Sequence, residues 1–213
     1  AGRVYTIDVG KGILHWKLRN NTRVVVMEET NARYVKSLPA LVSFVTIDAS
    51  FISLKILLPV VKGWLILPSS TLPLPLSPSP KLWEKERGVA LSDSEGPGGE
   101  VEGGAALVVL IKPQFEAGRR DAARGKGVIR DPEVHRRVLT DILTFAEDQG
   151  FSVSGLIQSP IEGPKGNIEF LAWLVYPAAL GMDWQVQIDL LISRPLVADT
   201  ENEPQRHEDT KKN

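Results

Sequence analysis

The sequence Ala105-Ala106-Leu107-Val108-Val109-Leu110-Ile111 is continuously apolar, and it is bounded by Gly103-Gly104 before it and by Lys112-Pro113 after it. A short apolar run between glycines and a proline is typical of a strand that is buried on both faces of its sheet. Such strands occur in sheets that are covered by helices. We therefore expect this run to be an inner strand of an α/β fold.

Strand and helix patterns alternate on both sides of this run. Strand patterns cover residues 3–9, 23–28, 41–48, 152–159 and 167–176, and helical patterns cover residues 13–19, 52–61 and 133–149. The last helix has Asp131 as a candidate N-cap, Pro132 at its first position and Gly150 after its end. This alternation predicts a mostly parallel sheet with helices on both faces.

Two stretches fall outside the alternating pattern. Residues 63–103 are rich in Pro and Gly, and we expect them to be a disordered insertion within a domain that spans residues 1–176. Residues 177–213 form a C-terminal extension, which becomes almost wholly polar and charged from about residue 200 and is expected to be disordered there.

Composition narrows the class of protein. The 213 residues are 43% hydrophobic and carry a formal net charge of -1, so any contact with RNA must be local. The chain has no cysteine and only three dispersed histidines, which predicts no metal site. Charged residues and prolines interrupt the most apolar stretch, 51–68, and no secretory leader is visible, so we expect a cytoplasmic protein without a membrane span.

Polar residues at the ends of the expected strands are the first candidates for a ligand site, because ligands collect there in open α/β sheets. Asp8 ends the first strand and could bind the hydroxyls of a ribose or simply form a turn. Glu28 ends the second, with Asn31 close behind it. These two residues could border an adenine or cap a helix.

Three further charged residues lie in strand or strand-end contexts. Asp48 ends the third expected strand, where the alternative is an ordinary helix cap. Lys112 follows the central apolar run, where the alternative is a side chain that extends to water. Glu169 lies in an apolar context and needs a partner. The three could form a charge-paired cluster that tunes the lysine, or a purely structural ion-pair network.

Basic residues gather directly after Lys112. They are Arg119, Arg120, Arg124, Lys126 and Arg130, interleaved with glycines. This composition indicates a flexible basic loop that is suited to phosphate contacts, and a merely solvated loop is the alternative.

Several segments, in order, resemble one known family. They are Val4-Tyr5-Thr6-Ile7-Asp8-Val9-Gly10, Met27-Glu28-Glu29-Thr30-Asn31-Ala32-Arg33, Thr46-Ile47-Asp48-Ala49-Ser50-Phe51-Ile52-Ser53-Leu54, Ile111-Lys112-Pro113-Gln114-Phe115-Glu116-Ala117-Gly118, Arg130-Asp131-Pro132 with His135-Arg136-Arg137, and Gly166-Asn167-Ile168-Glu169-Phe170-Leu171. They look like the TlyA family, also called hemolysin A or rRNA methyltransferase, within the FtsJ-like group.

The resemblance implies a Rossmann-like fold that transfers a methyl group from S-adenosylmethionine to a ribose 2'-hydroxyl of ribosomal RNA. Family members use a Lys-Asp-Lys-Glu set, and its last three members match Asp48, Lys112 and Glu169. Lys112 would act on the hydroxyl as a general base if neutral, or orient it if charged. Asp8, Asp48 and the segment from Glu28 to Asn31 would contact the cofactor.

The resemblance also implies what is missing. The family's first catalytic lysine, its glycine-rich cofactor loop and its S4-type RNA-binding domain would all precede Ala1, so we expect a methyltransferase domain that lacks its first strand and helix. The expected partner is ribosomal RNA or a ribosomal subunit. The alternative is a non-catalytic remnant that binds RNA or protein, or a hemolysin-like protein.

Overall fold

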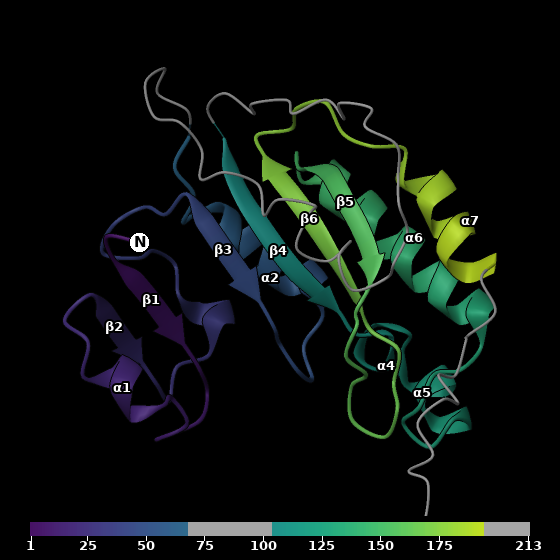
Figure 1. Cartoon of the computed structure of the whole chain (residues 1–213), viewed down its shortest axis with the longest axis horizontal. Helices are drawn as coiled ribbons and strands as arrows, with labels where there is room; N and C mark the ends of the chain where they lie inside the picture. The colour runs from purple at the N-terminus through teal and green to yellow at the C-terminus, as the bar shows by residue number, and fades with distance from the viewer. Residues whose placement is uncertain (68–103, 194–213) are drawn as a thin grey trace, which may run out of the picture.

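A computed structural model describes residues 1–67 and 104–193. Its larger sheet has the strand order β3-β4-β6-β5 (Figure 1). The strands are β3 (Phe44–Ile47), β4 (Ala105–Ile111), β5 (Ser152–Gln158) and β6 (Phe170–Tyr176). The apolar run on which the sequence interpretation rests is thus an inner strand, as predicted.

This larger sheet is mixed. β3 and β4 are parallel, whereas β6 runs antiparallel to both β4 and β5. The prediction of a mostly parallel sheet is therefore wrong for these strands. The physical reason is the short connection 159–169 between β5 and β6, which has no room for the crossover helix that a parallel pair usually needs.

A smaller sheet lies beside the larger one. It consists of β1 (Val4–Ile7) and β2 (Val24–Met27), which are parallel and are joined through α1 (Trp16–Arg19). A short 3-10 helix, η1 (Ala32–Tyr34), follows β2. In the described part of the chain, β1 pairs only with β2 and β3 only with β4, so each has one free edge.

Two helices cover one face of the larger sheet. α2 (Leu54–Lys62) and α6 (Pro132–Asp148) contact each other and lie behind the strands in Figure 1. Leu58 and Leu139 are fully buried there together with Leu107 of β4. Complete burial of such a side chain contributes about 1.5–3 kcal/mol. The sequence predicted helices on both faces of the sheet, but these two helices lie on the same face.

The ends of α6 follow the predicted signals. The Asp131 side chain accepts a hydrogen bond from the Glu133 backbone N–H at 3.0 Å, and Pro132 occupies the first turn. Gly150 follows the helix with a φ of 86°, a conformation that costs glycine little. Local capping chemistry therefore sets both ends.

Residues 63–67, which the sequence interpretation assigned to the insertion, belong to the packed fold. Trp64 and Leu65 are buried, Leu65 forms a bridge to Val42, and Trp64 Nε1 donates to the Val35 carbonyl at 2.9 Å. The remainder of the predicted insertion, 68–103, lies outside the described residues, as does the predicted disordered tail from about residue 200.

The C-terminal extension contributes a helix that the sequence did not predict. α7 (Trp184–Ser193) packs on α6 and β5 and buries Trp184 and Ile188. Two short helices follow β4, namely α4 (Pro113–Glu116) and α5 (Arg119–Arg124). No helix in the described ranges has the length and apolarity needed to cross a bilayer.

Candidate functional site

Lys112 and Asp48 meet at the carboxyl end of the parallel pair β3 and β4. The Lys112 Nζ lies 2.6 Å from Asp48 Oδ1 and donates to Ser50 Oγ at 3.3 Å. The Lys112 side chain is only 11% exposed, whereas the Asp48 side chain is 73% exposed. Lys112 therefore does not extend to water. Its ammonium group is shielded and pairs with the solvent-exposed Asp48 carboxylate.

Asp48 is not a helix cap. The N-cap of α2 is Ser53, whose Oγ accepts a hydrogen bond from the Lys55 backbone N–H at 3.1 Å. The purely capping interpretation of Asp48 is therefore wrong, and the carboxylate is left to pair with Lys112 at the end of the sheet.

Glu169 lies at the same end of the sheet, directly before β6. The antiparallel register pairs Ile111 with Phe170, so the residues that flank this pair, Lys112 and Glu169, are neighbours along the sheet end. Glu169 is buried, and its Oε1 accepts a hydrogen bond from Gln114 Nε2 at 2.7 Å. The structure thus brings the three predicted catalytic residues to one end, but the partner of Glu169 is Gln114, which the sequence interpretation missed.

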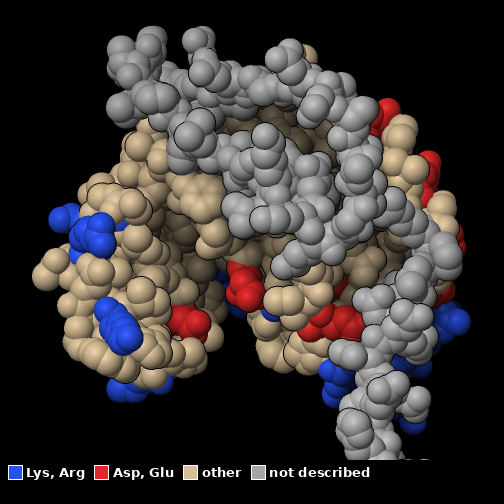
Figure 2. Space-filling model, viewed as in Figure 1, with Lys and Arg blue, Asp and Glu red and all other residues tan. Residues whose placement is uncertain are grey.

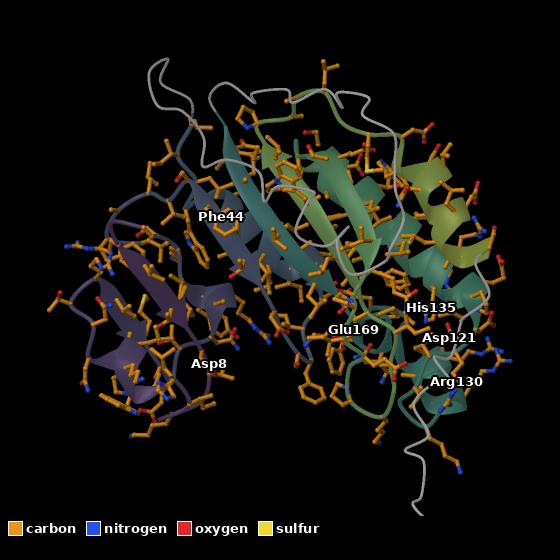
Figure 3. The ribbon with its side chains drawn as sticks, viewed as in Figure 1. Asp8, Phe44, Asp121, Arg130, His135 and Glu169 are labelled. Atoms are coloured by element: carbon orange, nitrogen blue, oxygen red, sulfur yellow. The ribbon has the colours of Figure 1, made fainter. Side chains whose placement is uncertain are left out.

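The predicted cofactor residues lie at the ends of β1 and β2. Asp8 is exposed, and its Oδ1 accepts a hydrogen bond from the Gly10 backbone N–H at 2.6 Å. Figure 3 shows Asp8 and Glu169 in the lower part of the view, on opposite sides of the end of β3. Asn31 caps η1 by accepting from the Arg33 backbone N–H at 3.1 Å. Asp8 forms the turn that was its alternative, and its exposed carboxylate stays accessible to a ligand.

Glu28 is engaged within the protein. Its carboxylate accepts hydrogen bonds from the Gly12 backbone N–H at 3.0 Å and from Arg19 Nη2 at 2.5 Å, with the Leu14 N–H at 3.5 Å. The Gly12 N–H, followed by Arg19, lowers the pKa of Glu28 to about 2. Glu28 therefore shapes the loop beyond Asp8 and is not a helix cap.

A cleft of about 600 Å³ separates β1 from β3. Its lining is mainly apolar, including Val4, Phe44 and Leu57, and it reaches Asp48 at one end. Figure 2 shows the corresponding hollow between the lobe of the smaller sheet and the rest of the molecule, with acidic side chains on either side of its mouth.

A pair of aromatic side chains, one exposed and one half-buried, lies next to Lys112 in the fold. Phe51 is 87% exposed, has a φ of 62°, and packs against Phe115 with ring centroids 4.6 Å apart. A positive φ is a strained conformation for a bulky residue, and such strain concentrates at functional sites. The sequence interpretation missed this pair. The only signal was the spacing of each Phe, three residues after Asp48 and three after Lys112.

The predicted basic loop is partly helical, because α5 covers its first half. Arg120, Lys126 and Arg130 are exposed. Arg124 is also exposed and lies 4.0 Å from Asp121, which pairs with Arg137 as well. The side chain of Arg119, which begins α5, is not among those described. Figure 2 shows Lys and Arg gathered at this end of the molecule.

Buried polar residues hold this basic segment against the sheet end. Asn167 accepts from the Ile129 backbone N–H at 3.1 Å and donates to the Gly127 carbonyl at 3.0 Å. The buried ring of His135 lies 3.1 Å from the Ile129 carbonyl, and burial lowers the pKa of His135, which favours its neutral form. Arg130 is thus anchored through the residue that precedes it.

The described residues contain no set of side chains placed to bind a metal ion. In residues 1–67 and 104–193, no group of three or more His, Cys, Asp or Glu side chains is arranged to hold a metal ion.

The chain is similar to curated proteins over most of its length. It is 39% identical over 183 residues to the rRNA methyltransferase candidate YqxC of Bacillus subtilis (strain 168), covering 83% of this chain and 51% of that protein. It is 34% identical over 176 residues to the 16S/23S rRNA (cytidine-2'-O)-methyltransferase TlyA of Mycobacterium tuberculosis, covering 82% and 52%. The chain thus spans about half the length of these relatives.

Solved structures agree with this similarity. A hemolysin candidate from Streptococcus thermophilus matches with a TM-score of 0.69 and 36% identity, over 90% of this chain and 57% of that one. The family model described as FtsJ-like methyltransferase matches residues 1–176. With Asp48, Lys112 and Glu169 gathered at one end of the sheet, the chain belongs to the family of FtsJ-like methyltransferases.

Proposed function

We propose that the protein containing this chain methylates a ribose 2'-hydroxyl of ribosomal RNA. The observation that carries the proposal is the shielded Lys112 held by Asp48 at the carboxyl end of the parallel strands. The two relatives named as rRNA methyltransferases support the substrate class, and the name of the M. tuberculosis protein supports the 2'-position. A ribosomal substrate is consistent with a cytoplasmic protein.

S-adenosylmethionine, the cofactor of FtsJ-like methyltransferases in general, supplies an electrophilic methyl group on sulfur. In the transfer, the 2'-oxygen would form a bond to the methyl carbon as the carbon–sulfur bond breaks, the sulfur would leave as a neutral thioether, and the hydroxyl proton would be released. Lys112 accepts that proton if its amine is neutral. If it is charged, it orients the oxygen as a hydrogen-bond donor while the proton passes to solvent. Correct placement of the hydroxyl supplies much of the rate enhancement.

The residues present fit the nucleoside half of this cofactor. The exposed Asp8 can accept hydrogen bonds from two ribose hydroxyls. Asp48 borders the cleft that lies between β1 and the larger sheet. Glu28 supports this half indirectly, because it holds the backbone beyond Asp8. Asn31 lies close behind and would border the adenine.

We also propose that the domain is completed by a further strand between β1 and β3. Both strands present a free edge to an apolar cleft. The unpaired backbone N–H and C=O groups of such edges can form hydrogen bonds to a further strand. The relatives are about twice as long as the matched part, which leaves ample chain for such a strand and for a loop around the methionine half of the cofactor.

RNA would approach from the end that carries the basic segment. Arg120, Arg124, Lys126 and Arg130 are exposed for phosphate contacts, and Arg119 belongs to the same segment. The Phe51 and Phe115 pair offers a stacking surface for an unpaired base beside Lys112. A base held there would present its ribose to the site.

The test is methyl transfer by the protein that the complete gene encodes. Labelled S-adenosylmethionine and unmethylated ribosomal subunits are mixed with the wild type, with Lys112→Ala and with Lys36→Ala, an exposed matched control. We expect transfer to a ribose 2'-oxygen by the wild type and the control, and a loss of at least about 100-fold in Lys112→Ala. Calorimetric titration should give the same cofactor affinity for all three proteins.

Two results would contradict the proposal. If the folded wild type binds rRNA or a protein partner but transfers no methyl group, the binding alternative is favoured. If Lys112→Ala retains full transfer, Lys112 has no part in the reaction.

A further inference from the structure

A buried polar pair lies behind the proposed catalytic lysine. Gln114 Nε2 donates to Glu169 Oε1 at 2.7 Å, and the two residues are only 9% and 5% exposed. Gln114 belongs to α4, whose first residue is Pro113, so one short segment carries both Lys112 and the amide that holds Glu169. The position of the Glu169 carboxylate is thereby tied to the position of Lys112.

The Glu169 carboxylate is also confined from the other side. A Cβ built on Gly163 would lie 2.2 Å from Glu169 Oε1 and 2.6 Å from its Cδ, a separation that real side chains do not reach. Gly163 does not have a positive φ, so its backbone does not require glycine. The absence of a side chain at position 163 makes room for the carboxylate.

Apolar packing alone does not account for Gln114. Its Oε1 is buried without a hydrogen-bond partner in the described residues, and an unsatisfied buried acceptor destabilises a fold relative to an apolar side chain of the same shape. The reversed amide would be worse, because it would place that oxygen against the carboxylate. A buried glutamine of this kind points to a task other than packing.

We propose that Gln114 is a positioning residue that, with the space left by Gly163, fixes the Glu169 carboxylate beside Lys112 for methyl transfer. The inference rests on the proposed function. Without the amide, the buried carboxylate loses its hydrogen-bond donor and is no longer held in one position. That change occurs next to Lys112 along the sheet end, because Lys112 and Glu169 flank the paired residues Ile111 and Phe170.

The experiment measures kcat, KM and unfolding temperature for variants of the complete gene product. Gln114→Met keeps the side-chain volume and removes the hydrogen bond. We expect a lower unfolding temperature, because the buried Glu169 carboxylate loses its donor, together with unchanged cofactor affinity and KM and a kcat lower by about 100-fold in the folded variant. Gly163→Ala should lower kcat in the same way. Gln185→Met and Gly155→Ala are matched controls, since Gln185 is exposed and a Cβ on Gly155 would make only ordinary contacts, the nearest at 3.5 Å to Trp173.

Gln114→Glu adds a readout that a packing role would not change. Its carboxyl can hold Glu169 only while one of the two is protonated, so the activity of this variant relative to the wild type should be highest at acidic pH and should fall as pH rises. A pH–rate profile parallel to that of the wild type would overturn the inference, even if Gln114→Met did not fold. Full kcat in folded Gln114→Met and Gly163→Ala would overturn the role of Gln114 but not the proposed function. A wild type that transfers no methyl group would overturn both.

Discussion

Lys112 reaches its position through strand register. It follows β4 directly, beside the end of β3, where Asp48 is the next residue after the paired segment. Shielding an ammonium group from water is costly unless a charge partner lies close, and the Nζ to Oδ1 distance of 2.6 Å supplies that partner. The sequence predicted the residue types and the strand ends, and their meeting follows from the parallel pairing.

Glu28 gives a prediction at the residue scale, in which Glu28→Gln destabilises the folded chain in a pH-dependent way. The pKa of Glu28 is lowered to about 2 from 4.5, so its contribution to stability is present above about pH 4.5 and is lost as pH falls toward 2. We expect the stability difference between wild type and variant to be largest near neutral pH and to shrink below pH 4.5.

The measurement is chemical unfolding at a series of pH values. Glu29→Gln is the matched control, because the Glu29 carboxylate is 64% exposed and pairs only with the exposed Lys11 among the described residues. A stability difference for Glu28→Gln that is constant from pH 7 to pH 3 would contradict the assigned role of its hydrogen bonds.

At the scale of elements, α2 begins where two side chains cap it. Ser53 Oγ accepts from the Lys55 N–H, and the carboxylate of Glu116 accepts from the Leu54 N–H at 2.8 Å and from Ser53 Oγ at 2.6 Å. The sequence placed the helix start near Ile52, and the observed start is Leu54. Glu116 lies in α4, which directly follows Lys112, and its hydrogen bonds connect this part of the chain to α2.

We therefore expect Ser53→Ala to lower the free energy of unfolding by about 1 kcal/mol, the usual cost of losing an N-cap. The exposed Ser37→Ala should leave it unchanged within about 0.5 kcal/mol. Urea unfolding curves of the three proteins provide the comparison. Equal midpoints for Ser53→Ala and wild type would mean that Glu116 alone sustains the helix start.

The contribution of Glu116 to stability changes with pH in the opposite direction to that of Glu28. Burial raises the pKa of Glu116 above 4.5, so its contribution favours the fold most below that pH and is lost as pH rises through the folded pKa. The stability lost in Glu116→Gln should consequently be greater at pH 4 than at pH 7. Thermal unfolding at both pH values checks the sign, and a larger loss at pH 7 would contradict it.

At the scale of the whole molecule, a cleft separates the two sheets of the described residues, so they do not form one continuous sheet. β1 and β3 each present one unpaired edge to it, while β4 and β6 are paired on both sides. Backbone amides at a free edge exchange with solvent through small local openings, whereas those inside a sheet need larger ones.

Hydrogen exchange should therefore divide the strands of this chain into two classes. We expect fast exchange for about half of the amides in β1 and β3, because alternate N–H groups face the cleft, and slow exchange throughout β4 and β6. In the complete gene product, protection of β1 and β3 should rise if a strand fills the cleft. Mass spectrometry of both proteins makes the comparison, and equal protection of β1 and β3 in the two would contradict the proposed strand.

Much of the fold could be predicted because its signals are local. The apolar run 105–111 matches β4 residue for residue, and Asp131, Pro132 and Gly150 set the limits of α6. Capping, turn formation and apolar patterning depend on neighbours in the chain, so the sequence displays them directly. The matched motifs also identified the family and the candidate residues Asp48, Lys112 and Glu169.

Tertiary structure alone decided the pairing of elements and side chains. The antiparallel direction of β6, the burial of Trp64, the docking of α7 and the choice of Gln114 as the partner of Glu169 all depend on residues that are distant in sequence. Strand order and buried hydrogen bonds are settled by which surfaces pack together, because most buried polar groups must find a partner within reach. That condition acts only on the assembled molecule.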